Sequence, residues 1–273
     1  MMDKILPIVV VYKEKLEEGN TYKSLLSRLD QSVFVLYDNS PKPLYHSDDL
    51  KDGVIYIHDP MNSGLSKAYN LASQIAAKLH YDWLLLLDQD TNFDFSFYDC
   101  LNDALSQNDN VSVFVPVIKY KEGQPFSPFR YRWNRGTGTN VSPGKYRLGK
   151  LLPVNSGACV KLSAFNDVGG YNENLRLDFS DVDFFMRLSR KNYEFIVLDS
   201  LANQSFSNME KDSDKIFTRF LSYLKDAKMC TKYGIGSRIG FLYAVLRHTL
   251  ALTIRTHDIR YITKFVNFYL YSL

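Results

Sequence analysis

The sequence has little cysteine and no excess of charge of either sign. Its three cysteines, Cys100, Cys159 and Cys230, are odd in number and widely separated among 273 residues. This argues against a disulfide framework and favours buried free thiols in a reducing, cytoplasmic setting. Lys and Arg number 33 against 30 Asp and Glu, a balance that argues against a nucleic-acid-binding protein. Any phosphate-bearing ligand must therefore be recognised by a local group of residues.

Long hydrophobic runs are missing as well. The nearest candidate for a membrane span, residues 239–246, is short and is followed directly by Arg247 and His248. The N-terminus lacks the apolar length and the small-residue cleavage site of a secretory signal, and residues 5–12 have the composition of a strand. We therefore expect neither export nor a spanning helix.

Several common site motifs are also missing. The five histidines and three cysteines show no paired spacing that would suit zinc. No Walker sequence is present, and Gly136-Thr137-Gly138 lacks the strand and helix context of a dinucleotide-binding loop. These patterns give no support for a zinc site, a P-loop or a dinucleotide-binding fold.

What is present is an alternation of short apolar runs with helical patterns. This predicts an α/β fold with a mainly parallel central sheet and helices on both faces. The expected strands are residues 5–12, 33–37, 54–58, 83–87 and 111–117. The clearest helix follows Asn62-Ser63-Gly64, and its apolar face comprises Leu65, Ala68, Tyr69, Ala72, Ile75, Ala76 and Leu79. We expect that face to pack on the sheet.

Two regions depart from this alternation. Residues 121–152 have no sustained period and are rich in Gly, Pro, Arg and Tyr, which predicts a long loop or an insertion of irregular strands. From Ser213 the pattern is helical to the end. We expect an α/β domain over residues 1–204 and a C-terminal helical extension over residues 205–273.

Two carboxylates follow the run 83–87, whose lack of alternation predicts a central strand buried on both faces. Asp88 and Asp90 therefore lie at the carboxyl edge of the sheet, where open α/β sheets bind ligands. Paired carboxylates suit Mg²⁺ or Mn²⁺, which take oxygen ligands and share their coordination with water and substrate phosphates. The pattern indicates a cation that holds a diphosphate; a capped polar turn is the structural alternative.

Two further motifs could line a nucleotide pocket. Asp38 and Asn39 also follow a buried strand, and an Asp there can accept hydrogen bonds from a base or a ribose; ordinary turn chemistry explains the same residues. Gly64 opens the clearest helix, where it permits close backbone approach and exposes N–H groups to an anion or a polar ligand. Simple capping of that helix is the alternative.

A fourth group lies later in the chain. Asn155-Ser156-Gly157 is followed by Gly169-Gly170-Tyr171-Asn172-Glu173 and then by three carboxylates, Asp178, Asp181 and Asp183. Apolar residues 184–186 draw the start of the next helix into the fold, so one of these carboxylates could act as a general base. Capping of the helix by Ser180 or Asp181 is the structural alternative.

The order of these motifs carries more information than any one of them. From about residue 5 to residue 190 the sequence resembles the inverting family 2 glycosyltransferases with the GT-A fold, and among them the rhamnosyltransferase-like members of bacterial polysaccharide assembly. The matching motifs are Asp38-Asn39-Ser40, Asn62-x-Gly64-x-x-x-Ala68-x-Asn70, Asp88-Gln89-Asp90, Ser156-Gly157, Gly169-Gly170-Tyr171-Asn172-Glu173 and Asp181-Val182-Asp183.

The resemblance implies a metal-dependent transferase. A Mn²⁺ or Mg²⁺ ion on Asp88 and Asp90 would bridge the diphosphate of a UDP- or dTDP-linked sugar. Asp181 would deprotonate the hydroxyl of a glycan or lipid-linked acceptor, with Asp183 and Asp178 in reserve. The implied substrate-binding residues are Asp38, Asn39, Asn62, Gly64, Asn70, Asp88, Gln89, Ser156 and Gly157. We expect a cytoplasmic location from the cysteines, with the inner face of the membrane as one option for the C-terminal helices.

The sequence departs from the family pattern at two points. Ser180 stands before Asp181, where relatives often have Glu, and the region of Gln204 lacks the histidine that many relatives use as a metal ligand. Two other functions compete: a sugar nucleotidyltransferase, for which residues 8–15 offer no triphosphate loop, and a catalytically silent protein that binds nucleotide sugars or glycans.

Two basic segments leave a choice between partner and packing. Residues 130–135 could meet an acceptor glycan or lipid diphosphate, or form a solvated loop. Basic residues also lie among the apolar ones of the helical extension, at Arg238, Arg247, Arg255, Arg260 and Lys264. The second pattern suits an interfacial helix on an anionic membrane, and packing against the α/β domain is an equal contender.

Overall fold

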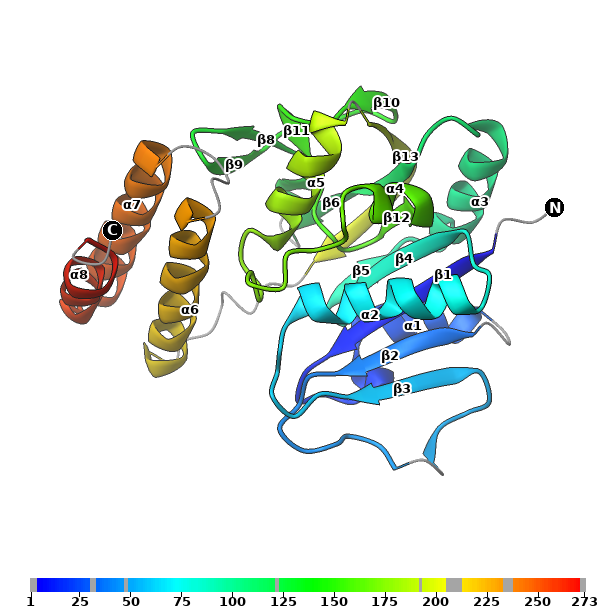
Figure 1. Ribbon diagram of the computed structural model, residues 1–273, viewed down its shortest axis with the longest axis horizontal. Coiled ribbons are helices and arrows are strands. Elements are labelled where there is room, and N and C mark those ends of the chain that lie inside the picture. Colours follow the sequence, from blue (N-terminus) through cyan, green and yellow to red (C-terminus); the bar gives the residue numbers. More distant parts are fainter. Residues whose placement is uncertain are drawn as a thin grey trace.

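The structure is a computed structural model that describes residues 4–29, 33–46, 49–120, 123–191, 193–204, 213–232 and 238–270. One large sheet occupies the centre, and the C-terminal helices stand at one end of it (Figure 1). Within the described residues, ten strands belong to this sheet, and its main path runs β10-β13-β6-β12-β4-β1-β2-β3. The strands of this main path are β1 Ile5–Val11, β2 Phe34–Asp38, β3 Val54–His58, β4 Trp83–Asp88, β6 Val113–Tyr120, β10 Gly144–Arg147, β12 Ala158–Lys161 and β13 Glu194–Gln204.

The sheet is mainly parallel, as the sequence predicts. Strands β1, β2, β3 and β4 pair in parallel, and so do β6 and β13. Strand β12 runs antiparallel between β4 and β6. The leucines of β4 are completely buried, which explains why their run shows no alternation. One edge of the sheet therefore holds the carboxyl ends of β1, β2, β4, β6 and β13.

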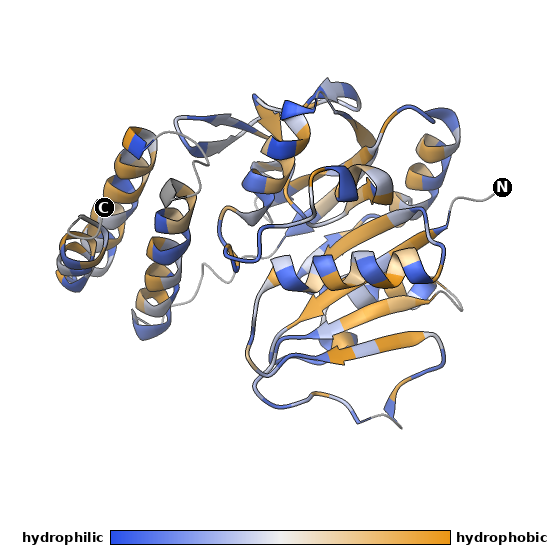
Figure 2. Ribbon diagram, in the orientation of Figure 1, coloured by the Kyte–Doolittle hydropathy of each residue, from blue (hydrophilic) through white to orange (hydrophobic). Residues whose placement is uncertain are grey.

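Helices lie on both faces of the sheet. Helix α2 crosses in front of it and α1 lies behind it (Figure 1). Their bounds, with those of the other helices of this part, are α1 Asn20–Ser24, α2 Leu65–Lys78, α3 Phe97–Gln107, α4 Leu162–Asp167 and α5 Ser180–Arg190, and 3₁₀ turns lie at Leu16–Glu18 and Leu26–Arg28. The hydropathy colouring shows the apolar sheet under the amphipathic α2 (Figure 2).

The predicted apolar face of α2 is confirmed except at its end. Ala68, Tyr69, Ala72 and Ala76 are all fully buried. The prediction for Leu79 is wrong, since 44% of its surface is exposed. The helix ends at Lys78 and Leu79 forms its C-cap, so the helical period no longer directs this side chain toward the sheet.

The irregular segment before β12 is the predicted insertion of short strands. Strands β8, β9 and β11 form a small separate sheet, whereas β7 pairs with β6 and β10 pairs with β13. Strand β5 also joins the main sheet, through β13. The bounds are β5 Thr91–Phe93, β7 Pro125–Ser127, β8 Phe129–Arg132, β9 Arg135–Gly138 and β11 Leu151–Leu152.

The C-terminal helices have a hydrophobic cluster of their own. They are α6 Ser213–Lys232, α7 Arg238–Thr256 and α8 Arg260–Lys264, followed by a π-helical turn at Phe265–Leu270. Their cluster includes Phe220, Leu224 and Phe241, and it reaches Leu175 in the segment before α5. We propose that these helices form a distinct extension, although the expected boundary after Gln204 adjoins residues outside the described ranges.

None of the described helices has the length and apolarity that a membrane crossing requires. The three cysteines are free, and Cys159 and Cys230 are buried.

Candidate active site

The carboxylate pair lies at the carboxyl edge of the sheet. Asp88 is the last residue of β4, and Asp90 stands in the turn to β5. The Tyr69 hydroxyl donates to Asp88 Oδ1 at 3.2 Å, and Gln204 Nε2 donates to Asp90 Oδ1 at 3.3 Å. Burial, the Asp90 charge and the Asp181 charge raise the pKa of Asp88 to about 7, whereas the Tyr69 bond lowers it. Burial also raises the pKa of Asp90.

Asp181 lies in the first turn of α5 and faces the same region. Burial and the nearby Asp178 charge raise its pKa to about 6, whereas the Val182 N–H, which donates to Asp181 Oδ1 at 2.7 Å, lowers it. The charges of Asp88 and Asp181 both raise the pKa values of Tyr69 and Tyr171, after burial as the main cause. The two tyrosine rings contact each other, with centroids 5.2 Å apart. The structure thus brings the start of α5 to the end of β4.

The other two base candidates are paired with arginines. Asp183 is buried, and its Oδ2 lies 2.7 Å from Arg187 in the next turn of α5. Asp178 lies 3.0 Å from Arg219 of α6. No cationic partner is recorded for Asp181 within the described parts of the chain. Of the three predicted carboxylates, Asp181 is therefore the one that no arginine of the described residues neutralises.

The capping alternative for this segment is not what the structure shows. The N-cap of α5 is Phe179, in a left-handed conformation with φ of 63°, and no side chain caps the helix there. The Ser180 hydroxyl donates instead to the carbonyl of Leu177 at 3.1 Å.

The segment before α5 is held from two sides. On one side, α2 donates to it through Leu65 N–H to the Arg176 carbonyl, at 3.0 Å, and through Ser66 Oγ to the Leu175 carbonyl, at 2.6 Å. On the other side, the buried Asp226 of α6 accepts from the N–H groups of residues 177 and 178, at 3.2 and 2.9 Å. The C-terminal extension therefore helps to position the loop that carries Asp181.

Gly64 permits the close approach between α2 and this segment. It has φ of +99°, and a Cβ there would overlap the carbonyl of Arg176. The predicted close backbone approach thus exists, but its partner is the chain itself. The carbonyl of Asn62 also accepts a hydrogen bond from the Arg176 guanidinium.

We expect Gly64→Ala to lower the free energy of unfolding by about 3 kcal/mol, because the new methyl group adds an overlap to the strain of a positive φ. Gly169→Ala is the matched control: its φ is +74°, but nothing lies within 4 Å of the new Cβ. It should cost only about 1 kcal/mol. Urea denaturation of both variants measures the difference, and equal losses would contradict this account.

The nucleotide-side motif is buried at the end of β2. Asp38 accepts from Ser40 N–H and Leu44 N–H, each at 2.8 Å, and from Tyr56 Oη at 2.7 Å. These bonds use three of the roughly four acceptor positions of the carboxylate, and Asp38 has no exposed surface. Asn39 differs, because its buried Oδ1 has no hydrogen-bond partner among the described residues. Asn39 is therefore the residue of this motif with an unused polar atom.

Other predicted substrate-binding residues make contacts within the chain. Asn70 Oδ1 accepts from Tyr171 N–H at 2.7 Å, which ties α2 to the Gly-Gly-Tyr segment. Gln89 Oε1 accepts from Tyr12 N–H at 2.7 Å, beyond the end of β1. The Ser156 hydroxyl is buried 2.6 Å from that of Thr91. These contacts hold the loops around the carboxylates in place.

Gly157 is constrained by its neighbours. It has φ of +75°, and a Cβ there would lie 2.8 Å from the side chains of Phe93 and Pro116. Its N–H donates to the Leu86 carbonyl at 2.8 Å. The residue therefore lets the chain pass close to β4 just before the strand ends at Asp88.

The side chains around the carboxylate pair determine whether a cation could bind there. Within the described ranges, no cluster of three or more His, Cys, Asp or Glu side chains could hold a metal. However, Gln204 is buried beside Asp90, and its Oε1 has no hydrogen-bond partner among the described residues. Two carboxylates and an unused amide oxygen are hard oxygen donors of the kind that Mg²⁺ and Mn²⁺ take.

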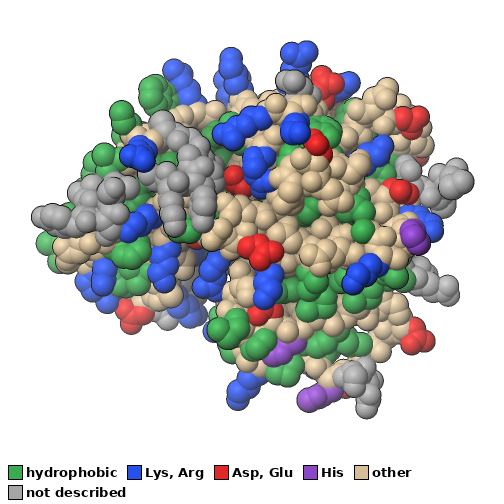
Figure 3. Space-filling model, in the orientation of Figure 1, with side chains coloured by type: hydrophobic (Ala, Val, Ile, Leu, Met, Phe, Trp, Pro, Cys, Tyr) green, Lys and Arg blue, Asp and Glu red, His purple; other side chains and the backbone are tan. Residues whose placement is uncertain are grey.

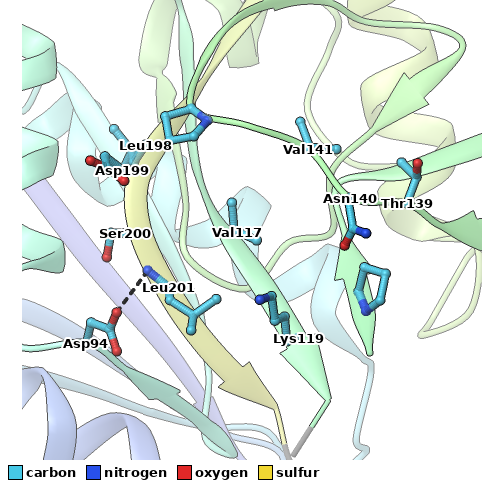
Figure 4. A pocket seen from close by; sticks show the side chains of 12 residues that line it. Asp94, Val117, Lys119, Thr139, Asn140, Val141, Leu198, Asp199, Ser200 and Leu201 are labelled. Atoms are coloured by element: carbon cyan, nitrogen blue, oxygen red, sulfur yellow. Dashed lines mark hydrogen bonds between the residues drawn. The ribbon is translucent and has the colours of Figure 1, made fainter. Parts of the chain in front are cut away.

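A hollow of about 300 Å³ lies beside β6 and β13 (Figure 4). Asp94, Lys119 and Ser200 are among its lining residues. Asp94 accepts from Leu201 N–H at 3.1 Å across the β5 and β13 pair. None of the predicted site residues lines this hollow, and we assign it no role.

The family model described as "Glycosyl transferase family 2" matches residues 8–166, which is more than half of the chain. The chain belongs to glycosyl transferase family 2. It is 25% identical over 214 residues to the low-salt glycan biosynthesis hexosyltransferase Agl10 of Haloferax volcanii, covering 75% of this chain and 68% of that protein. It is 23% identical over 192 residues to the dTDP-rhamnosyl transferase RfbF of Shigella flexneri, covering 68% and 64%.

Solved structures agree on the fold. S. aureus TarS 1–349 in complex with UDP-GlcNAc has a TM-score of 0.54 at 15% identity, covering 81% of this chain and 66% of that one. GalNAc-T7 with UDP, GalNAc and Mn²⁺ has a TM-score of 0.53 at 14% identity, covering 75% and 44%. This glycosyl transferase family 2 chain therefore has the predicted GT-A fold. It spans about two thirds of the length of both curated relatives.

Three residues of this family 2 chain were not predicted as site residues. Gln204 comes close to Asp90 because it lies at the end of β13, opposite Thr91 of β5. No local sequence pattern reveals this strand pairing. Asp226 has a faint signal, since it stands beside the buried Ala227 in an amphipathic helix. The Tyr131 hydroxyl is buried without a hydrogen-bond partner among the described residues, and Asp181 is one of the groups that raise its pKa, after burial as the main cause.

Proposed function

We propose that the protein is an inverting glycosyltransferase that uses a UDP- or dTDP-linked sugar and a glycan or lipid-linked acceptor in cell-surface polysaccharide synthesis. One observation carries this proposal: Asp181, the candidate carboxylate that has no arginine partner among the described residues, faces the same region as Asp88 and Asp90. A base and a diphosphate-binding pair directed at one space suit a single displacement between donor and acceptor.

A divalent cation would be held by Asp88 and Asp90, with Gln204 Oε1 as a further donor. When bound, it would neutralise charge on the departing nucleoside diphosphate. The raised pKa values of both aspartates support this role, because buried carboxylates that crowd one another are relieved by a positive charge. GalNAc-T7, which shares the fold, was crystallised with Mn²⁺ and UDP.

Asp181 acts as the general base. With a pKa of about 6 it is mostly ionised at neutral pH, yet more basic than an ordinary aspartate. It accepts the acceptor hydroxyl proton as the oxygen attacks the anomeric carbon and the bond to the nucleoside diphosphate breaks. Attack from the face opposite the leaving group inverts the configuration.

The donor and acceptor sides are assigned from unused polar atoms. Asn39 Oδ1 is available to the nucleoside, and Asp38 shapes the loop beside it. On the other side, the Tyr131 hydroxyl is available to the acceptor near Asp181. Tyr131 belongs to the basic and aromatic segment 130–135, so that segment would border the acceptor.

The test is a thermal stabilisation screen of nucleotide sugars with and without Mn²⁺. A bound donor raises the apparent stability in proportion to the logarithm of its concentration over Kd. We expect a UDP- or dTDP-linked sugar to raise Tm only when Mn²⁺ is present. If no nucleotide sugar shifts Tm under either condition, the proposal is wrong.

We expect Gln204→His to tighten Mn²⁺ binding about ten-fold and Gln204→Leu to weaken it by a similar factor. Histidine supplies an imidazole nitrogen as a ligand. Leucine removes the amide oxygen but fills a similar volume. Electron paramagnetic resonance of free Mn²⁺ measures both affinities in the absence of substrate. Unchanged affinity in both variants would exclude Gln204 from the metal site.

A further inference from the structure

Helix α7 has an apolar face on each side. Phe241, Val245 and Leu252 are buried in the cluster of the C-terminal extension. On the opposite side, large apolar side chains recur every three or four residues and stay exposed: Ile239, Leu242, Tyr243, Leu246, Leu250 and Ile254. Ile239 is 78% exposed and Ile254 is 72% exposed. This outer face is named the α7 outer face.

Singly exposed apolar residues are ordinary, but a contiguous row along four turns of one helix is not. Helix α7 lies at the end of the molecule away from the sheet, beyond α6 (Figure 1). Hydrophobic and basic side chains gather together over this end of the molecule (Figure 3). The combination indicates a surface that is covered in use.

The charge around this face identifies its partner. Residues 213–270 contain ten Lys and Arg but only three Asp and Glu, although the whole chain is nearly balanced. Helix α7 has three arginines and no acidic residue. Arg238, Arg247 and Arg255 are all exposed, and no ion pair is recorded for them among the described residues. The apolar row is therefore accompanied by exposed positive charge.

We propose that the α7 outer face docks on an anionic lipid surface. An amphipathic helix that lies in the plane of a bilayer buries its apolar face at the headgroup boundary while its basic residues contact lipid phosphates. A second copy of this chain is a poorer occupant, because the same excess of positive charge would meet across the interface. Anionic headgroups complement both features at once.

The proposal gives the extension two sides with different tasks, and this part rests on the proposed function. Its inner side holds the loop before Asp181 through Asp226 and Arg219. Its outer side would lie on the membrane. The reacting groups would then be held near the bilayer surface, where a lipid-linked acceptor presents its glycan.

The experiment is cosedimentation of the full chain with vesicles of phosphatidylcholine alone or mixed with phosphatidylglycerol. We expect binding only to the mixed vesicles and weaker binding at high salt. Arg247→Glu should weaken it by at least about five-fold, since one basic residue at an anionic surface contributes about that factor. Ile239→Ser combined with Ile254→Ser should weaken it by roughly ten-fold or more.

Phe95→Ser is the matched control, because Phe95 is also 78% exposed but lies between β5 and α3; it should bind as the wild type does. Equal binding to both vesicle types, or by all variants, overturns the proposal. Self-association that the double isoleucine variant abolishes, without vesicle binding, overturns it in favour of a second copy. Donor-induced stabilisation of the same variants reports on the transferase proposal separately.

Discussion

Replacing Asp181 by asparagine is expected to lower the transfer rate by roughly a hundred- to ten-thousand-fold, the range that a general base contributes. The amide keeps the size of the side chain but cannot accept the proton of the acceptor hydroxyl. Donor binding should persist, because the donor is assigned to Asn39 and the Asp88 pair. The measurement is turnover with the donor found by thermal screening, alongside the donor-induced shift in Tm.

Asp183→Asn is the control for this variant. Asp183 stands two residues away in the same helix, but it pairs with Arg187. Its loss should lower the free energy of unfolding by about 2 kcal/mol, because an arginine is left without its partner, while turnover by the folded protein stays near that of the wild type. Full activity of the Asp181 variant would exclude Asp181 as the base. Donor binding without turnover in the wild type, unchanged by Asp181→Asn, would instead support a silent binding protein.

The pH profile gives an independent check on Asp181. A base must be ionised to act, and burial raises the pKa of this carboxyl to about 6. Transfer by the wild type should therefore fall as the pH drops through about 6. In the asparagine variant the residual rate should lack this limb.

Asp88→Asn should have two opposite effects. Transfer should fall by at least roughly a hundred-fold, because the cation that offsets charge on the leaving diphosphate loses a ligand. The metal-free protein should become more stable at neutral pH, because the crowded charge beside Asp90 is removed. Denaturation and turnover of the same preparation measure both effects.

The sign of the stability effect follows from the pKa of Asp88. It is raised from 3.8 to about 7 on folding, by burial first and then by the charge of Asp90. A carboxyl that binds its proton more tightly in the folded chain stabilises the fold fully below the unfolded pKa. That contribution is lost as the pH rises toward 7. In Asp88→Asn the free energy of unfolding should therefore fall less steeply as the pH rises toward 7. If it falls equally in both proteins, the raised pKa of Asp88 is contradicted.

Asp90→Asn is the second arm of this test. Asp90 carries the same kind of raised pKa and accepts from Gln204. If the pair binds one cation, both asparagine variants should lose stabilisation by Mn²⁺. If Mn²⁺ raises the Tm of either variant as much as that of the wild type, that residue is not a ligand.

Five strands of the sheet were predictable because each has a recognisable local pattern of apolar residues. Residues 83–87 lack alternation since β4 is buried on both faces, and the carboxylates at its end follow from that placement alone. The helical face of α2 was equally clear up to Leu79, where the helix ends. Local pattern therefore sufficed for β1, β2, β3, β4 and β6, for α2, and for the position of Asp88 and Asp90, but not for β12 and β13.

The contacts between distant segments were not predictable. Nothing in the sequence near Asp178 shows that Arg219 of α6 pairs with it. The Asp183–Arg187 pair differs, because its members are four residues apart in α5, a spacing that the sequence itself offers. The pairing of β5 with β13, which brings Gln204 to Asp90, depends on the whole sheet. Tertiary packing determines which of these side chains meet. The sequence therefore gives the candidate carboxylates, and only the structure shows what surrounds each of them.

The most direct test of the central claim is a calorimetric titration of the nucleoside diphosphates UDP and dTDP into the wild type and into the variant with both Asp88→Asn and Asp90→Asn, each with and without Mn²⁺. We expect the wild type to bind one of them only when Mn²⁺ is present and the double variant to bind neither. Binding of equal strength in both proteins, independent of Mn²⁺, would contradict a diphosphate held through this carboxylate pair.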